Sequence, residues 1–394
     1  MGLFSRGNNT YLDWASSAPV LEETLAVFNE AVRLRGNPSS PHRDGVEALR
    51  VLEEARTNIA RMVQVKTRAV VFTSGATEAN NLAIQGRIAK CLEDGKGYED
   101  LHVLCLPTMH SSVRKTIESL EKKGVKTEAI PLAEGKIDTG ELAKLIRPET
   151  VLICADAVCG ETGIRYDVLR IRRAIDAAKL SDTCALLVDA SQLPLVEPID
   201  ITRLGASMLT LDAQKVAGIR GVGALIIPKR PFISPITFGG GQEFGLRPGT
   251  EPVALIAAFA TALEVRARGV EVFRTGAGEA RAHLLATLAT NLPTMLINEA
   301  KDQEPHILNI SFPGIDTDYA VMLLDSRGFS VSTRSACETD SENGSEVVRI
   351  LTGDQARAAS TLRISWGPET PEKDLKRFAE ALISTIRFLE ANTI

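Results

Sequence analysis

The chain has 394 residues and a net charge of −5. This length allows two domains of ordinary size, and the interspersed charges give no electrostatic footprint for nucleic acid or an anionic membrane. The longest apolar run, around residues 252–265, is too short to span a bilayer, and the first nine residues lack the apolar stretch of a secretion signal. Six cysteines in a chain this long do not make a disulfide framework, so we expect reduced thiols and a cytoplasmic location.

Short apolar runs alternate with amphipathic stretches between about residues 68 and 230. The runs are rich in Val, Ile and Leu, as strands buried on both faces tend to be, and residues 167–181 repeat apolar side chains at helical spacing. This alternation predicts a mainly parallel sheet covered by helices on both sides, an α/β fold. The runs that we expect to form strands are AVVFTS (69–74), HVLCLP (102–107), TVLICADAV (150–158), CALLVDAS (184–191), ASMLTLDA (206–213) and GALIIP (223–228).

The pattern changes after about residue 270. Short strands are expected at ILNISF (307–312), FSVST (329–333) and TLRISW (361–366), with helices between them, which is typical of an α+β domain. A last helix is expected to begin at Thr370 and Pro371 and to bury one apolar face. We therefore expect a large domain over residues 15–255 and a small domain that combines residues 1–14 and 256–394.

Polar residues that follow the expected strands are candidates for a site, because ligands collect at the carboxyl ends of strands in such sheets. The turn Gly75, Ala76 and Thr77 precedes a helix and is suited to a phosphate, although an ordinary helix cap would have the same sequence. Asp189 ends a buried run, where a cation or the next turn would stabilise its carboxylate. Lys215 follows another run; it is either a solvated surface charge or a desolvated amine that forms a Schiff base.

In this order, the phosphate turn, His110, Asp189 and Lys215 resemble the fold-type-I enzymes of pyridoxal 5'-phosphate (PLP). Further motifs make the chain similar to the NifS/IscS-like cysteine desulfurases of the class V aminotransferase group. The resemblance extends from residue 11 to the last helix and implies a large domain with a mainly parallel seven-stranded sheet and a smaller α+β domain. The motifs are GNPSSPH (36–42), RPGT (247–250), STRSAC (332–337) and LRISWG (362–367).

The resemblance implies a role for each candidate residue. Lys215 would form the Schiff base with PLP and remove the substrate α-proton, Asp189 would pair with the pyridinium nitrogen, and His110 would stack on the ring and take part in proton transfer. Asn37 and Arg363 would bind the substrate α-carboxylate. The other implied cofactor ligands are Gln192 at the phenolic oxygen, Gly75, Ala76, Thr77 and Gln214 at the phosphate, and Arg247 with Thr250 donated by a second subunit, which implies a homodimer.

Cys337 lies in a polar stretch, residues 332–346, that is rich in carboxylates. By the resemblance, its thiolate attacks the sulfur of bound L-cysteine and carries it away as a persulfide, which leaves L-alanine. A mobile tether suits such a nucleophile better than a packed core. The persulfide would then supply iron–sulfur cluster assembly or tRNA thiolation through a sulfur-acceptor protein, either a scaffold or a tRNA-thiolation protein.

Departures from the family pattern leave other functions open. The family has Asn at the position of Gly160, and Ser-Gly-His at 212–214, where this chain has Asp212 and Gln214; an ionised Asp212 facing a phosphate would be repulsive. The alternatives are a selenocysteine lyase or another class V aminotransferase-like enzyme in which Cys337 is dispensable, and a degenerate homologue that acts as a binding partner. A nucleotide-binding oxidoreductase is excluded because no G-x-G-x-x-G follows the first strand, and no metal site is expected.

Overall fold

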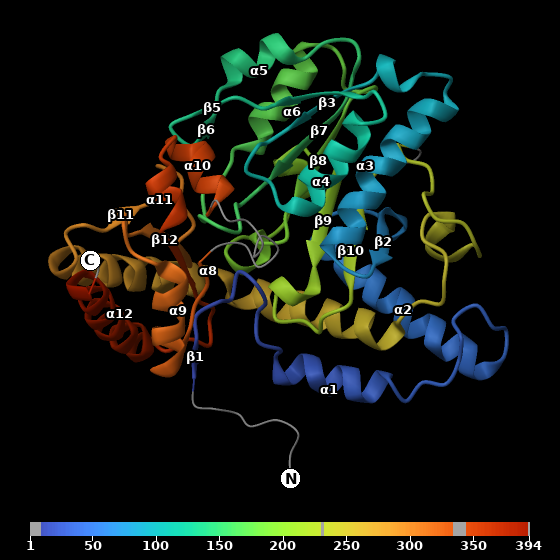
Figure 1. Ribbon diagram of the computed structural model, residues 1–394. Coiled ribbons are helices and arrows are strands. Elements are labelled where there is room, and N and C mark those ends of the chain that lie inside the picture. Colours follow the sequence, from blue (N-terminus) through green and yellow to red (C-terminus); the bar gives the residue numbers. More distant parts are fainter. Residues whose placement is uncertain (1–8, 230–231, 334–343, 393–394) are drawn as a thin grey trace. The chain divides into compact units, whose positions relative to one another are not determined.

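The computed structural model describes residues 9–229, 232–333 and 344–392 (Figure 1). Its chain divides into two compact units. The predicted domain ranges, 15–255 and 1–14 with 256–394, place the change of domain near the start of a long helix, α8 (Val253–Asn291), whereas the division between the units falls inside that helix. The larger unit comprises Pro19–Val158 and Tyr166–Val270, and the smaller unit comprises Met1–Ala18, Cys159–Arg165 and Glu271–Ile394.

A seven-stranded sheet forms the centre of the larger unit (Figure 1). Its order is β2-β10-β9-β8-β7-β3-β4. The five strands from β9 to β4 run parallel, and only β10 runs antiparallel to its neighbours β2 and β9, so the predicted mainly parallel sheet is confirmed. The strands are β2 (Val70–Thr73), β3 (His102–Cys105), β4 (Lys126–Ala129), β7 (Thr150–Asp156), β8 (Ala185–Asp189), β9 (Met208–Asp212) and β10 (Gly223–Ile226).

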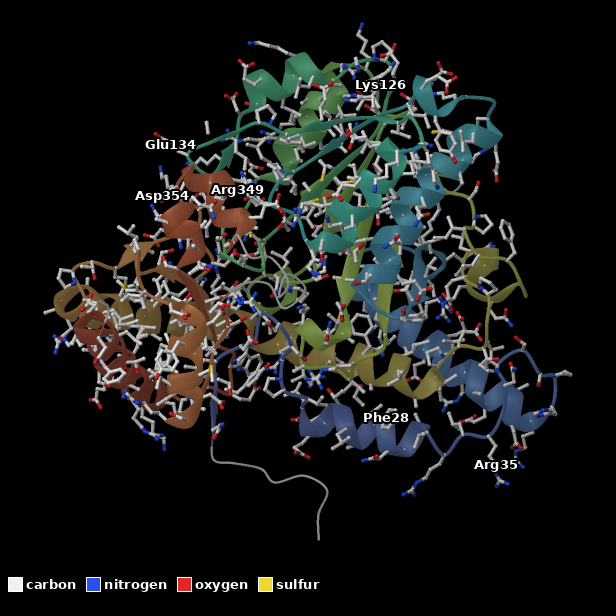
Figure 2. The ribbon with its side chains drawn as sticks, viewed as in Figure 1. Phe28, Arg35, Lys126, Glu134, Arg349 and Asp354 are labelled. Carbon is white, nitrogen blue, oxygen red and sulfur yellow. The ribbon has the colours of Figure 1, made fainter. Side chains whose placement is uncertain are left out.

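All six apolar runs that predicted strands form them. Every residue of β7 is buried, and because successive side chains alternate between faces, both faces of the sheet must be covered there. The edge strand β4 was not predicted, because its sequence KTEA contains no apolar run and its side chains are exposed or half-buried. Lys126, at the start of β4, is exposed (Figure 2), and a charged edge of this kind protects a sheet from pairing with other chains.

Helices connect the strands of the larger unit. The predicted helix over 167–181 is confirmed as α6, and it buries Val168, Ile171 and Ile175 as the helical spacing requires. A small hairpin joins β5 (Leu132–Ala133) to β6 (Lys136–Ile137). The helices are α1 (Glu22–Ala31), α2 (Arg43–Met62), α3 (Ala76–Glu93), α4 (Ser111–Glu121), α5 (Thr139–Leu145), α6 (Val168–Ala177) and α7 (Ile201–Leu204), with short 3-10 turns η1 (Thr67–Ala69), η2 (Tyr98–Asp100), η3 (Leu193–Leu195), η4 (Ala213–Lys215) and η5 (Gln242–Gly245).

The smaller unit has an α+β architecture. Its antiparallel sheet has the order β11-β12-β14, and a separate parallel pair joins β1 to β13 with Thr10 opposite Phe329. The last helix, α12, starts at Glu372, just after the predicted start, and buries the predicted apolar face around Phe378. The elements are β1 (Thr10–Tyr11), β11 (Leu296–Ile297), β12 (Ile307–Ser311), β13 (Phe329–Ser330), β14 (Thr361–Ser365), α9 (Thr317–Ser326), α10 (Glu346–Thr352), α11 (Gln355–Ala359) and α12 (Glu372–Asn392).

Among the described residues, no helix combines the length and the apolar character that crossing a membrane requires.

Candidate functional site

A chain of hydrogen bonds joins His110 to Asp189 at the carboxyl end of the central sheet. Asn80, fully buried within α3, donates from Nδ2 to Asp189 Oδ2 at 2.8 Å and to Ser112 Oγ at 3.1 Å. The Ser112 hydroxyl in turn lies 2.9 Å from His110 Nδ1. Thr210 donates to Asn80 Oδ1 at 2.9 Å, so both ends of the buried amide are satisfied and its orientation is fixed.

Asp189 is the last residue of β8, and its second oxygen is also occupied. Oδ1 accepts hydrogen bonds from the N–H of Ser191 at 3.0 Å and from its hydroxyl at 2.6 Å. With the bond from Asn80, the carboxylate is therefore held on both oxygens by neutral donors. A carboxylate fixed in this way is suited to pair with a protonated ring nitrogen, the role predicted for it.

His110 caps the amino end of α4. Its Nδ1 accepts from the Ser112 N–H at 3.1 Å, and a neutral imidazole whose Nδ1 accepts carries its proton on Nε2. Burial lowers the pKa of His110, and the charges of Lys215 and Arg114 lower it further against the opposing effect of Asp189. The ring therefore presents Nε2 as a donor rather than as a base.

Lys215 lies in η4, directly after β9, and is half-buried. Its charge lowers the pKa of His110 and acts on the carboxyl of Asp212. The N–H of Gln214 donates to Asp212 Oδ1 at 3.0 Å, which shapes the turn that carries the lysine. The structure thus brings Lys215, His110 and Asp189 together at one edge of the sheet.

The predicted phosphate turn connects β2 to α3. Gly75 has a φ of 150°, a conformation that residues with a Cβ rarely adopt. The turn packs against the start of β10, where a Cβ on Gly223 would come within 2.7 Å of the Gly75 Cα. Both glycines are therefore required for the turn to approach the sheet this closely.

Carboxylates of the chain itself bind two N–H groups of this turn. Ala76 donates to Asp212 Oδ2 at 2.9 Å, and Ser74 donates to Glu78 Oε2 at 2.6 Å. Glu78 also pairs with Arg247 Nε at 2.9 Å. Burial raises the pKa of Asp212, although the bonds from Ala76 and Gln214 and the charge of Lys215 limit the rise.

The other predicted cofactor and substrate residues of the larger unit lie in loops. Gln192 is buried and precedes η3, three residues after Asp189. Thr250 and Asn37 are both exposed, and Asn37 Nδ2 lies 3.5 Å from Thr250 Oγ1. Asn37 Oδ1 accepts from the N–H of Ser39 at 2.9 Å.

Arg363 lies on β14 in the smaller unit and is buried. Its Nη2 donates to Asp13 Oδ1 at 2.8 Å and to Ser16 Oγ at 2.6 Å, and its Nη1 donates to the carbonyl of Gly160 at 3.1 Å. Within the part of the chain that the structure describes, its Nε finds no hydrogen-bond partner. The other predicted catalytic residue, Cys337, lies outside the described residues.

Two polar residues of the site were not predicted. Asn80 lies in the second turn of α3, where no sequence pattern separates it from its polar neighbours. Asp156 ends β7 directly opposite Asp189 on β8, and its position at the end of a strand could have revealed it. Asp156 is 7% exposed, and its Oδ1 has no partner among the described residues. Burial, with a smaller effect of Asp189, raises the pKa of Asp156 to about 8.

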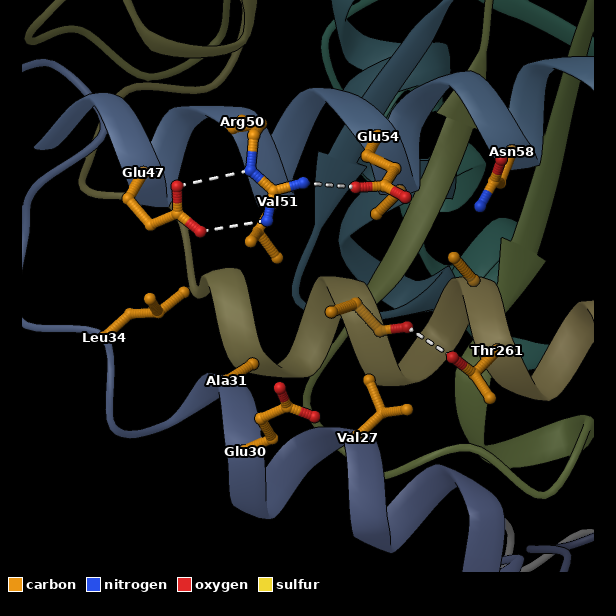
Figure 3. Close-up of a pocket in the computed structure, with 13 residues that line it drawn as sticks. Val27, Glu30, Ala31, Leu34, Glu47, Arg50, Val51, Glu54, Asn58 and Thr261 are labelled. Atoms are coloured by element: carbon orange, nitrogen blue, oxygen red, sulfur yellow. Dashed lines mark hydrogen bonds and ion pairs between the residues drawn. The ribbon is translucent and has the colours of Figure 1, made fainter. Parts of the chain in front are cut away.

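A separate pocket of 360 Å³ lies between α1, α2 and α8 (Figure 3). Arg50 bridges Glu47 and Glu54 on its wall at 2.9 and 3.0 Å. None of the described residues predicted for the site lines it, so the pocket is distinct from the site. Its lining is Val27, Glu30, Ala31, Leu34, Glu47, Arg50, Val51, Glu54, Ala55, Asn58, Ala257, Ala260 and Thr261.

Comparison with known proteins identifies the family. The sequence pattern of class-V aminotransferases matches residues 10–378. The chain belongs to the class V aminotransferase family. Within it the chain is NifS/IscS-like: the cysteine desulfurase IscS 1 of Archaeoglobus fulgidus is 33% identical over 386 residues, which cover 97% of this chain and 98% of that protein.

Solved structures of relatives share the fold. A NifS-like protein is 28% identical, covers 97% of this chain over its full length and has a TM-score of 0.88. The protein SspA, solved in complex with cysteine, is 29% identical, covers 92% of this chain over its full length and has a TM-score of 0.77. Enzymes of this class V group depend on PLP.

The residues of the site fit the aldehyde and the ring of PLP better than they fit its phosphate. Lys215, Asp189 and His110 are suited to the aldehyde, the ring nitrogen and the ring face. At the phosphate turn, however, the N–H groups of Ala76 and Ser74 already bind carboxylates.

Proposed function

We propose that the chain is a PLP-dependent cysteine desulfurase, which converts L-cysteine to L-alanine and transfers the sulfur to Cys337 as a persulfide. The curated relatives named cysteine desulfurase support this function over nearly the whole length of the chain. The observation that carries it is the grouping of Asp189, His110 and Lys215 at one edge of the central sheet.

Each of these residues has a distinct task in the reaction. PLP, when bound, supplies an electron sink for the charge that develops at the substrate Cα. Lys215 would hold the cofactor aldehyde through Nζ, and its amine, once the substrate amine has displaced it from the aldehyde, would take the proton from Cα. Asp189 would pair with the ring nitrogen of the cofactor through the carboxylate that Asn80 and Ser191 hold in place. His110 would lie against the cofactor ring, with the hydrogen on Nε2 available as a donor.

The sulfur transfer requires no external oxidant. The Cys337 thiolate attacks the sulfur of bound L-cysteine, so that an S–S bond forms as the substrate C–S bond breaks. The substrate β-carbon gains a proton and leaves as part of L-alanine, and Cys337 retains the persulfide. The sulfur then passes to an acceptor protein, an iron–sulfur scaffold or a tRNA-thiolation protein.

Arg363 and Asn37 are proposed to bind the substrate α-carboxylate. The buried Nε of Arg363, which has no hydrogen-bond partner among the described residues, supports this role, because it can still donate to a carboxylate. The bonds from the terminal nitrogens to Asp13, Ser16 and Gly160 fix the plane of the guanidinium.

The deciding experiment measures both products from L-cysteine in the presence of a reductant. Wild-type protein is expected to release equal amounts of alanine and sulfide. The Lys215→Ala variant is expected to lose both products together with the visible absorption of the bound cofactor. The Cys337→Ser variant is expected to keep the absorption and release no sulfide. Undiminished sulfide release by Cys337→Ser would refute the assigned nucleophile, and undiminished release of selenide from selenocysteine by that variant would favour a selenocysteine lyase.

A catalytically degenerate homologue that acts as a binding partner is the second candidate. The carboxylates of Asp212 and Glu78 at the phosphate turn favour it, because they occupy N–H groups that a phosphate would need. A purified protein that stays colourless after incubation with PLP would refute the first function and favour the second.

The functional molecule is proposed to be a cytoplasmic homodimer. The exposed aromatic ring of Phe238, 87% exposed and followed by three glycines, supports the dimer. So does the motif that carries Arg247 and Thr250, which resembles a segment that crosses to a second subunit. The low cysteine content supports the cytoplasmic location, which fractionation of cells that produce the protein would test.

A further inference from the structure

We propose that Asp212 competes with the phosphate group of PLP for the amino end of α3, so that the phosphate adds little to cofactor affinity in this chain. This inference rests on the attachment of the cofactor to Lys215 but not on the reaction that follows. It concerns which form of vitamin B6 the site retains.

The position of the Asp212 carboxylate is the first support. It ends β9, three residues before Lys215, and its two oxygens accept from the N–H groups of Ala76 and Gln214 at 2.9 and 3.0 Å. Oδ2 also lies 3.3 Å from the place where a Cβ on Gly75 would be. The carboxylate therefore sits in the turn itself, on the side of the lysine.

An amide N–H carries a single hydrogen, which is the second support. The helix α3 is 18 residues long, and its amino end attracts anions through the N–H groups of its first turn. While Asp212 accepts the hydrogen of Ala76, a phosphate oxygen cannot accept it. A phosphate that approached would also be repelled by the negative charge of the carboxylate.

The negative charge of the second carboxylate at the turn, that of Glu78, is balanced by an arginine. Glu78 binds the N–H of Ser74 but also pairs with Arg247 at 2.9 Å. Burial alone would raise the pKa of Glu78, but the hydrogen bonds from Arg247 and Ser74 outweigh burial and lower it. Asp212 is more deeply buried, at 7% exposed, and is the carboxylate on the side of Lys215. Asp212 is therefore the residue to change.

The test compares PLP with pyridoxal, which has the same ring and aldehyde but no phosphate. The dissociation constants of both compounds are measured on the full-length, cofactor-stripped protein, from the absorption that the aldehyde acquires on attachment. In wild type the two constants are expected to lie within about tenfold of each other. In Asp212→Ser, PLP is expected to bind about tenfold more tightly or better, whereas the constant for pyridoxal changes by less than about twofold.

Two further variants make the result specific. Asp212→Asn keeps the size of the side chain and an acceptor oxygen but removes the charge, so it should tighten PLP binding by a smaller factor than Asp212→Ser. If Asp212→Ser does not fold, Asp212→Asn tests the proposal in its place. Asp138→Ser is the matched control, because Asp138 accepts from two N–H groups, those of Gly140 and Glu141, at the start of α5. It should leave the ratio of the two constants unchanged.

Other outcomes would overturn the proposal. The proposal is wrong if both Asp212 variants prefer PLP over pyridoxal no more than wild type does. It is also wrong if Asp138→Ser changes the ratio of the two dissociation constants as much as the Asp212 variants do. If wild type binds neither compound, this proposal and the proposed function both fail. If it binds both but forms no alanine from cysteine, only the proposed function fails.

Discussion

At the scale of single residues, two carboxyl groups end neighbouring strands side by side. Asp156 and Asp189 are paired in register on β7 and β8, and side chains at paired positions point to the same face of a sheet. Asn80 and Ser191 hold Asp189 with three hydrogen bonds, whereas Asp156 is buried with one oxygen unpartnered among the described residues. Asp156 therefore keeps its proton at neutral pH, because burial raises its pKa to about 8.

Replacing Asp156 with Asn should change how stability depends on pH. The pKa of Asp156 is raised by burial to about 8 in the folded chain and is about 3.9 in an unfolded chain. Between these values the folded state keeps a proton that the unfolded state has lost, so wild-type stability falls as pH rises, by about 1.4 kcal/mol per pH unit from this group. The free energy of unfolding of Asp156→Asn relative to that of wild type, measured by urea unfolding, should therefore be higher at pH 8 than at pH 5.

The control for this prediction is Asp182→Asn, at an exposed position. Its free energy of unfolding relative to that of wild type should be the same at pH 5 and pH 8. Parallel stability curves for wild type and Asp156→Asn would contradict the assignment of a proton to Asp156.

The sequence predicted those site residues that stand just after recognisable strands. Asp189 and Lys215 follow apolar runs, and parallel strands end at a common edge, so their meeting could be expected. Asn80 could not, because a polar residue that faces inward from a helix looks like one that faces solvent. The occupation of the Ala76 N–H by Asp212 depends on a contact between segments 136 residues apart in sequence, which no local pattern encodes.

At the scale of elements, the short turn η5 is fixed to the sheet by one buried ion pair. Glu243 binds both terminal nitrogens of Arg56 on α2 at 2.8 Å and accepts from the N–H of Phe72 on β2 at 2.7 Å. The side chains of Arg56 and Glu243 are 3% and 1% exposed. Glu243 and Phe244 have φ values of 48° and 62°, which are unfavourable for residues with a Cβ, so the ion pair holds the turn in a strained shape.

Replacing Glu243 with Gln should destabilise the chain strongly. The change removes the charge of the buried carboxylate that binds both terminal nitrogens of Arg56, and breaking a buried pair in this way costs about 3–5 kcal/mol. Chemical denaturation is expected to show a loss of that size. The matched control is Glu53→Gln, since Glu53 contacts the same guanidinium at 3.0 Å with a side chain that is 46% exposed, and it should cost less than about 1 kcal/mol. Equal losses in the two variants would contradict this account.

Elements with an apolar pattern were predicted, and elements without one were not. The six central strands and α6 follow from their runs and periodicity. The edge strand β4 and the turn η5 do not, because β4 forms through backbone pairing with β3 and η5 is held by an ion pair between residues 187 positions apart.

At the scale of the whole molecule, the chain passes several times between its two units. The segment Cys159–Arg165 belongs to the smaller unit although the residues on either side of it belong to the larger one. The sequence predicted two domains, but an excursion of seven residues is too short to produce a change in composition or periodicity. Gly160 lies in this segment, and its carbonyl accepts a hydrogen bond from Arg363.

The proposed homodimer yields a prediction at this scale. Replacing Phe238 with Ser should weaken self-association, because a buried Phe side chain contributes about 1.5–3 kcal/mol and a symmetric dimer buries two of them. The dimer dissociation constant is therefore expected to rise roughly 100-fold or more, as measured by light scattering over a dilution series. Val272→Ser, at a position that is 80% exposed in the smaller unit, should leave it unchanged. A wild-type monomer at all concentrations would refute the dimer.

The parallel pair of β1 and β13 has a consequence for synthesis on the ribosome. Thr10 lies opposite Phe329, so about 320 residues are translated between the two partners. At the usual elongation rates of about 5–20 residues per second, the first strand waits roughly 16 to 64 s for the second. The larger unit, complete by Val270, is synthesised before that pairing, so β1 stays without its partner strand while the larger unit can already fold.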